Sequence, residues 1–237
     1  MKSVHHSSGS RGLAEHGWLT SRHTFSFAGY HDPERMNFGA LRVLNDDIVK
    51  QGKGFGTHPH DNMEIISIPL SGALEHQDSM GTGSVIRTHD VQIMSAGTGV
   101  YHSEFNHSQK EEVNFLQLWI FPKERNIEPR YDQMTFLPES MHNRLQLVVS
   151  PNEGNSSLWI NQDAYLSLGE LETDRHIHYT FHKKGNGLYI FMIEGKADVS
   201  GQRLEKRDGM GIWETDHLSF HFRDRSKVLL IEVPMTF

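Results

Sequence analysis

Four residues with metal-binding side chains occur as two pairs of equal spacing. His58 and His60 stand at i and i+2, and about forty residues later His102 and Glu104 do the same. Successive side chains of a β-strand point to opposite faces, so the members of each pair share a face. Two such strands side by side would bring imidazoles and a carboxylate to one point. This ligand set suits a divalent transition metal of the iron, nickel, copper or zinc type.

The residues around these pairs narrow the chemistry further. Pro59 has no backbone N–H, so it belongs at the start of a strand or in an edge strand, where a site usually opens. The chain has no cysteine, which excludes disulfides, zinc-thiolate sites and cysteine nucleophiles. The 17 histidines are then the available soft nitrogen ligands.

The elements that must position these residues are predicted to be short β-strands. Apolar segments of four to eight residues alternate with Gly or Asp/Asn turn signals, a pattern typical of an all-β sandwich or barrel. The apolar segments are 40–44, 65–70, 91–94, 113–120, 145–149, 188–193, 218–222 and 228–233. The expected turns are 45–47, 71–72, 81–83, 185–187 and 200–201. Short helical turns are expected only near 138–142 and 161–164.

A faint repeat divides the chain into two halves. Segment 65–70 leads through Gly72 into a return strand, and segment 190–193 leads through Gly195 in the same way. An acidic turn and another apolar strand follow each hairpin. The segment between the halves, 122–154, has the proline-rich, mixed-charge composition of a linker. We therefore predict two copies of one β-barrel.

Composition limits the partners. The formal net charge is −7 and the lysines and arginines are scattered, which argues against a direct nucleic-acid surface. No apolar run is long enough to span a membrane. The N-terminus lacks the apolar region of a signal peptide, so a cytoplasmic protein is expected. The acidic charge is consistent with a monomer.

The motif residues resemble those of a known superfamily. Gly52-x5-His58-x-His60-x3-Glu64, the hairpin Gly72, and Gly97-x4-His102-x3-Asn106 are similar to the paired motifs of the cupins. More specifically, residues 24–33 (TFSFAGYHDP), 36–47 (MNFGALRVLNDD) and 54–60 (GFGTHPH) resemble the signature of the pirin family of two-domain cupins. This match covers about residues 15–120.

The resemblance implies a fold and a ligand set. It implies two tandem cupin barrels of the double-stranded β-helix (jelly-roll) type. They would comprise residues 1–130 with the metal site and residues 131–237 without one. Cupins in general take the carboxylate ligand from the position of Glu64, whereas pirins take it from the position of Glu104. Strand parity leaves both open, and the resemblance favours Glu104, with Glu64 behind the ligands.

The remaining histidines are expected to have ordinary roles. His176 and His178 repeat the i, i+2 spacing, but no His-x-Glu pair follows them. We expect them to be strand residues that face solvent or a domain interface. We expect surface or hydrogen-bonded core positions for a further set: His5, His6, His16, His76, His89, His107, His142 and His221.

The resemblance also implies an activity, because pirins include quercetin 2,3-dioxygenases and a nuclear iron protein that modulates transcription-factor binding to DNA. We expect one divalent metal per chain, Fe(II) in the first place, with Ni, Cu, Mn, Co and Zn as alternatives. The expected substrates are a small aromatic flavonol and O2, with Glu104 or Glu64 as catalytic base. The alternative is a non-catalytic, metal-binding regulatory protein that acts through a protein partner.

Overall fold

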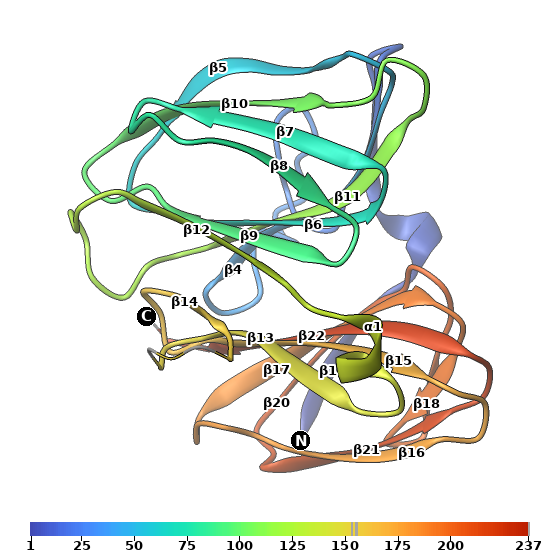
Figure 1. Cartoon of the computed structure of the whole chain (residues 1–237). Helices are drawn as coiled ribbons and strands as arrows, with labels where there is room; N and C mark the ends of the chain where they lie inside the picture. The colour runs from blue at the N-terminus through green and yellow to red at the C-terminus, as the bar shows by residue number, and fades with distance from the viewer. Residues whose placement is uncertain (153, 155, 237) are drawn as a thin grey trace.

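The computed structural model describes residues 1–152, 154 and 156–236, and it shows two β-barrels that pack against each other (Figure 1). Each barrel consists of a seven-stranded and a four-stranded sheet. The predicted all-β fold with two tandem cupin barrels is confirmed. No helix among the described residues is long and apolar enough to cross a membrane.

The first barrel contains the two motif pairs. Its large sheet has the order β12-β9-β6-β11-β4-β3-β2, and its small sheet has the order β5-β10-β7-β8. The strands are β2 (Gly12–Glu15), β3 (Leu19–His23), β4 (Leu41–Val49), β5 (Gly54–His60), β6 (Glu64–Ser71), β7 (Ala73–Asp78), β8 (Gly83–Arg87), β9 (Asp90–Ser95), β10 (Val100–Asn106), β11 (Val113–Ile120) and β12 (Arg130–Thr135).

The second barrel repeats this plan. Its sheets have the orders β1-β20-β17-β22-β15-β13-β14 and β16-β21-β18-β19. The strands are β1 (Lys2–His6), β13 (Leu145–Ser150), β14 (Leu158–Trp159), β15 (Tyr165–Leu171), β16 (His176–Thr180), β17 (Asn186–Glu194), β18 (Ala197–Val199), β19 (Gln202–Leu204), β20 (Gly209–Trp213), β21 (His217–Phe222) and β22 (Ser226–Pro234). A short 3-10 helix, Ser8–Ser10, follows β1, and helix α1 (Pro138–Met141) precedes β13.

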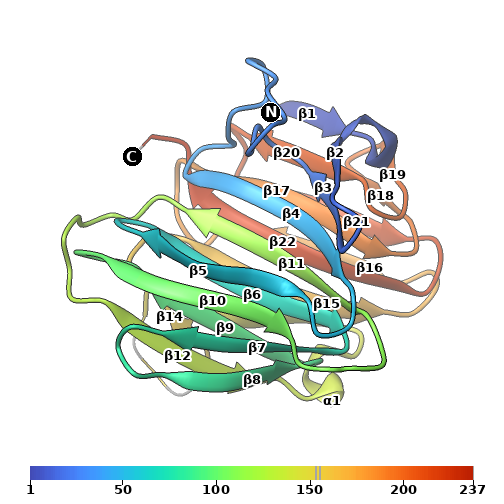
Figure 2. The same ribbon diagram turned by 90° about the horizontal axis from the view of Figure 1, so that it is seen from above.

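The two large sheets face each other across the main hydrophobic core (Figures 1 and 2). This core joins buried side chains of β6 and β11 to those of β17 and β22, for example Ile66 and Leu118 with Phe191 and Ile231. Strands buried on both faces have nearly continuous apolar sequences. Seven of the eight predicted apolar segments lie within strands, and the eighth, 40–44, begins one residue before β4.

Two short segments differ from the predictions. Residues 45–47 were expected to form a turn, but they lie inside β4 and are buried. Asn45 is opposite Gln117 in the ladder between β4 and β11, and the Asp47 carboxylate receives a hydrogen bond from Ser21, so the segment continues the strand and Asp47 has a polar partner in place of solvent. The expected helical turn at 161–164 is wrong, because residues 161–163 form bends. The expected helical turn near 138–142 is present as α1.

One strand, β1, crosses the division between the barrels, and β12 spans the predicted domain boundary. β1 pairs with β20 in the second barrel although it is the first strand of the chain. β12, which spans residues 130–135, pairs with β9 in the first barrel. The boundary between residues 130 and 131 stays a prediction, and a cut there would separate Arg130 from the rest of β12.

Candidate metal centre

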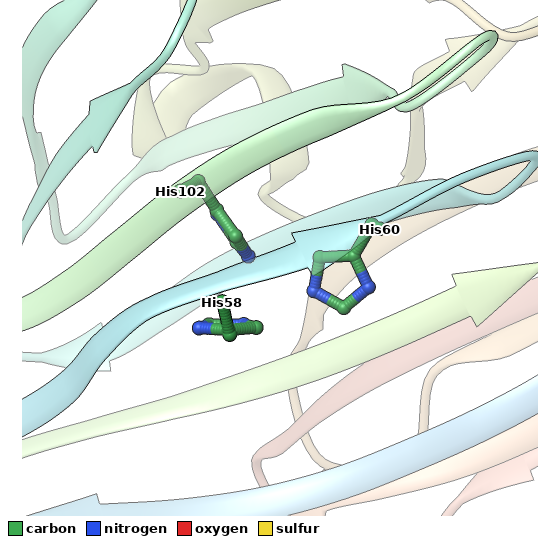
Figure 3. A group of neighbouring side chains, drawn as sticks. All are labelled: His58, His60 and His102. Carbon is green, nitrogen blue, oxygen red and sulfur yellow. The ribbon is translucent and has the colours of Figure 1, made fainter.

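Three histidines converge on one point inside the first barrel. His58 and His60 lie on β5 and His102 lies on β10, and Figure 3 shows their rings turned toward a common space. His58 is directly opposite His102 in the antiparallel pairing of the two strands. One ring nitrogen from each residue lies within 4.8 Å of the other two. The structure thus brings together the three histidines that the spacing singled out, and β5 is an edge strand, as expected from Pro59.

The protonation states of these rings suit metal binding. Burial lowers the pKa of His60 to about 4, with a further contribution from neighbouring His58. Burial lowers the pKa of His102 to about 2, and the nearby His58 and His60 add to the effect. Both rings are therefore neutral near pH 7 and present lone pairs. Nδ1 of His58 lies 2.8 Å from the carbonyl oxygen of Gly56, which can only accept a hydrogen bond, so Nδ1–H donates and Nε2 is the nitrogen left for an ion.

His102 gives the sharpest test of whether a metal fits. Its side chain is only 2% exposed, and neither ring nitrogen has a hydrogen-bond partner among the described residues. A buried polar atom without a partner costs about 1–3 kcal/mol. A divalent ion among the three rings would satisfy a nitrogen that the protein leaves unpaired. The residues present therefore fit the metal that the motif predicts.

Glu104 is close to this group but is held by neutral donors. It is 2% exposed; Ser67 donates to one carboxylate oxygen at 3.0 Å and Gln117 to the other at 2.7 Å. Burial raises the pKa of Glu104 to about 7, although these two hydrogen bonds lower it. Glu104 belongs to a second group of converging ligand atoms, which it forms with His102 and His76. Its role as a ligand stays a prediction, supported by this shared histidine.

Glu64 lies elsewhere. It accepts hydrogen bonds from Ser95 of β9 at 2.8 Å and from the backbone N–H of Asn161 in the second half of the chain at 3.3 Å. It belongs to neither group of converging ligand atoms found among the described residues. Its expected place behind the ligands is thus not supported by these contacts, which put it between the two barrels. Its catalytic role stays a prediction.

Several residues of the site were not singled out by the sequence. Ser67 and Gln117 face each other across β6 and β11 and both bond to Glu104. Trp119 lies against His60, with 4.8 Å between ring centroids. His76, expected to be an ordinary histidine, is fully buried beside His102. The spacing of His76 and Asp78, again i and i+2, is a signal that could have revealed this second pair.

The histidines of the second barrel have other contacts. The ring of His176 stacks on His221 at 4.0 Å, and Nδ1 of His178 lies 3.1 Å from the Ser219 hydroxyl. Both His176 and His178 are exposed, as expected for strand residues that face solvent. Neither belongs to a group of converging ligand atoms in the part of the chain that the structure describes.

A cavity of about 660 Å³ opens in the first barrel, and its lining residues include none of His58, His60, His102 and Glu104. Phe27 lines it, and the Phe27 ring contacts Trp119, which in turn contacts His60. Its walls combine aromatic side chains with a few polar ones, the pattern of a small-molecule pocket. The lining includes Trp18, Tyr30, Phe55, His23, Asn45 and Asp47.

Comparison with known proteins gives consistent results for both barrels. The family model described as "Pirin" matches residues 5–120, and that described as "Quercetinase C-terminal cupin domain" matches residues 147–233. The chain is 43% identical over 225 residues to a quercetin 2,3-dioxygenase of Escherichia coli (strain K12), covering 94% of this chain and 95% of the relative. It is 36% identical over 222 residues to a pirin-like protein of Caulobacter vibrioides, covering 93% and 95%.

The comparison with solved structures points to the same family. The crystal structure of a bacterial pirin from Escherichia coli in complex with nickel(II) superposes with a TM-score of 0.93. Its sequence is 41% identical, and the match covers 98% of this chain and 99% of that one.

Proposed function

The chain belongs to the pirin family, and on this premise we propose that it is a metal-dependent dioxygenase that opens flavonols such as quercetin with O2. The observation that carries the proposal is the group of three converging histidines in the first barrel, together with a partly apolar cavity in the same barrel. The similar protein of Escherichia coli named quercetin 2,3-dioxygenase supports the same reaction class.

The proposed metal is one divalent transition ion per chain, held by His58, His60, His102 and Glu104. The nickel(II) in the similar pirin supports a divalent ion. We propose Fe(II), with Ni, Cu, Mn, Co and Zn as alternatives, because imidazole and carboxylate donors accept all of them. Four protein donors leave open positions on a six-coordinate ion, as in catalytic rather than structural sites. We further propose that the second barrel holds no metal.

The chemistry divides between the ion and the protein. A bound ion would stabilise the oxyanion of the flavonol 3-hydroxyl by charge and, if redox-active, would give access to O2. Glu104 is the one carboxylate among the converging ligand groups of the described residues. Each of its oxygens receives one hydrogen bond and keeps a second lone pair, so it can still take the substrate proton.

The cavity accounts for binding of a flat substrate. Phe27 and Phe55 provide apolar wall, and Asp47 provides a hydrogen-bond acceptor for a phenolic hydroxyl. Burial raises the pKa of Asp47 to about 7, and the nearby charges of Asp46 and Glu104 add to the effect. A neutral or weakly charged Asp47 would avoid a second full negative charge near the substrate oxyanion.

Aerobic turnover tests the proposal. The metal-free protein is reconstituted separately with Fe(II), Ni(II), Cu(II) and Mn(II), and quercetin loss, O2 uptake and carbon monoxide release are followed. We expect at least one metal to give one O2 consumed and one CO released per quercetin. Metal binding without CO release for any of the four would contradict the dioxygenase and favour the non-catalytic regulatory alternative.

A further inference from the structure

Two buried polar side chains of the cavity in the first barrel lack partners. His23 on β3 and Asn45 on β4 line this cavity and lie opposite each other in the antiparallel pairing of the two strands. They are 3% and 2% exposed, respectively. The Cβ atoms of directly opposite residues lie about 4.5–5.5 Å apart, so one ligand group can contact both side chains.

Neither side chain has all its hydrogen bonds satisfied within the protein. Nδ1 of His23 and Oδ1 of Asn45 are buried and have no hydrogen-bond partner among the described residues. The His23 ring contacts aromatic rings instead, with 5.2 Å to Phe27 and 6.4 Å to Tyr30 between ring centroids. A buried polar group without a partner destabilises the fold, so two of them side by side indicate a ligand that completes their hydrogen bonds.

The charges around these two residues define the kind of group that they can bind. Burial, with smaller contributions from Arg11 and His16, lowers the pKa of His23, so its ring is neutral near pH 7. The cavity is lined by the carboxyl group of Asp47 and by no lysine or arginine, which disfavours an anionic ligand. A neutral imidazole and an amide match a hydroxyl group, because a hydroxyl both donates and accepts a hydrogen bond.

This polar pair is connected to the metal centre through one neighbouring strand. Asn45 is opposite Gln117 of β11, and the Gln117 amide donates to Glu104 at 2.7 Å. Aromatic side chains line other walls of the cavity. A flat ligand that extends from the side of Glu104 into the cavity would therefore bring an outer ring, and not its reacting part, to His23 and Asn45.

We propose that His23 and Asn45 form a hydroxyl-recognition subsite and that they select, among flavonols, those with a hydroxyl group on an outer ring. The inference rests on the proposed function, because it takes a flavonol as the ligand of the cavity. A site built to bond a hydroxyl group discriminates against the analogue that lacks it, because the buried polar groups of the site are then left unpaired.

Binding without turnover tests the proposal. The full chain, loaded with Ni(II) and kept under argon, is titrated with quercetin, which has hydroxyl groups on both outer rings, and with 3-hydroxyflavone, which has none there. Quenching of tryptophan fluorescence reports binding, since Trp18 lines the cavity. We expect the wild type to bind quercetin at least about 10-fold more tightly, in line with the cost of unpaired buried groups. In His23→Phe and in Asn45→Leu, the ratio of the two affinities should fall towards one.

His16→Phe is the matched control for His23→Phe. His16 lines the same cavity but is exposed, so solvent replaces any partner that it loses, and the variant should keep the wild-type affinity ratio. Urea unfolding separates recognition from a structural role. Replacing an unpaired buried polar group by an apolar one should leave the free energy of unfolding equal or higher, whereas loss of a structural residue would lower it. Either variant decides if the other does not fold.

A wild-type affinity ratio in the folded variants would overturn the proposal, as would a wild type that binds the two flavonols equally or binds neither. Carbon monoxide release from quercetin in air together with such a result would overturn this inference alone. A chain that prefers quercetin through His23 and Asn45 but releases no carbon monoxide with any metal would end the proposed function and leave the inference intact.

Discussion

We propose that Glu104 sets the charge of the metal centre. Its hydrogen-bond partners, Ser67 and Gln117, are neutral, and burial lowers the pKa of His60 and of His102, so these two rings are neutral as well. Its carboxylate is therefore the negative charge that would partly balance a divalent ion, and a nearby positive charge would favour its ionised form.

Glu104→Gln tests this role. The amide has the same shape but no charge, so we expect Ni(II) affinity to fall by at least about 10–100-fold in a competition titration. Glu64→Gln, which changes a carboxylate bonded to Ser95 and Asn161, should have a smaller effect. Glu104→Gln with wild-type affinity would show that Glu104 is not a ligand.

Glu64 makes stability depend on pH. Burial raises its pKa from 4.5 to about 7, so between these values the folded protein binds a proton that the unfolded chain has lost. Stability contributed by the protonated form is therefore lost as pH rises through this window. Compared with Glu64→Gln, the metal-free wild type should lose up to about 3 kcal/mol between pH 4.5 and pH 8.

Urea unfolding of both proteins at the two pH values measures this change. Subtracting the free energy of unfolding of the variant from that of the wild type at each pH removes the contribution of the other titrating groups. A difference that stays constant from pH 4.5 to pH 8 would show that Glu64 ionises in the fold as easily as in the unfolded chain.

The close contact between strands β5 and β10 decides whether the histidines converge. Gly54 starts β5 opposite Phe105 of β10. A Cβ added there would lie 2.2 Å from the carbonyl oxygen of Glu104 and 2.5 Å from the Cα of Phe105. Both are backbone atoms of β10, so the collision is relieved only if the two strands move apart.

Gly54→Ala should therefore weaken metal binding and lower the free energy of unfolding by about 1–3 kcal/mol, the usual cost of overpacking. Gly56→Ala is the control on the same strand, because nothing lies within 4 Å of its added Cβ. Calorimetric Ni(II) titration and urea unfolding of both variants measure the two effects. Equal behaviour of the two variants would mean that the spacing of β5 and β10 does not limit the site.

The observed strands show what a sequence pattern can predict. The i, i+2 rule located His58, His60 and His102 because strand geometry fixes which side chains share a face. The turn signal of Asn and Asp misassigned residues 45–47. These residue types favour turns, whereas the polar interior of the barrel that accommodates them is a property of the tertiary structure. Asn45 is opposite Gln117, and Gln117 is opposite Ser67, so a polar row crosses the sheet. His76 is a hydrogen-bonded core residue, one of the two expected kinds of position, but its place opposite Glu104 could not be predicted because it depends on the pairing of β7 with β10.

In the whole molecule, the barrels are linked by one exchanged strand, β1, as well as by a shared core. β1 adds to the second barrel and β12 to the first, while large buried side chains of both barrels form one cluster. The repeat in the sequence predicted two barrels, but it contains no information about which strand pairs across the division. Nδ1 of His6 on β1 lies 2.8 Å from the hydroxyl of Tyr189 on β17, a bond that spans 183 residues.

We therefore expect fragment 131–237 not to fold alone. It lacks β1, leaves the edge of β20 unpaired and exposes the apolar face of its large sheet. Circular dichroism and urea unfolding should show no cooperative transition, whereas co-expression with fragment 1–136 should restore one. A cooperative transition of fragment 131–237 by itself would show that the exchanged strand is dispensable.

We propose that one ion in the first barrel makes this protein a flavonol dioxygenase. The most direct test titrates the metal-free protein with Fe(II), kept reduced, and measures the initial rate of CO release from quercetin at each occupancy. We predict that the rate rises in proportion to bound metal and stops rising at one ion per chain. No CO at full occupancy, an equal rate without metal, or a rise that continues to two ions would contradict it.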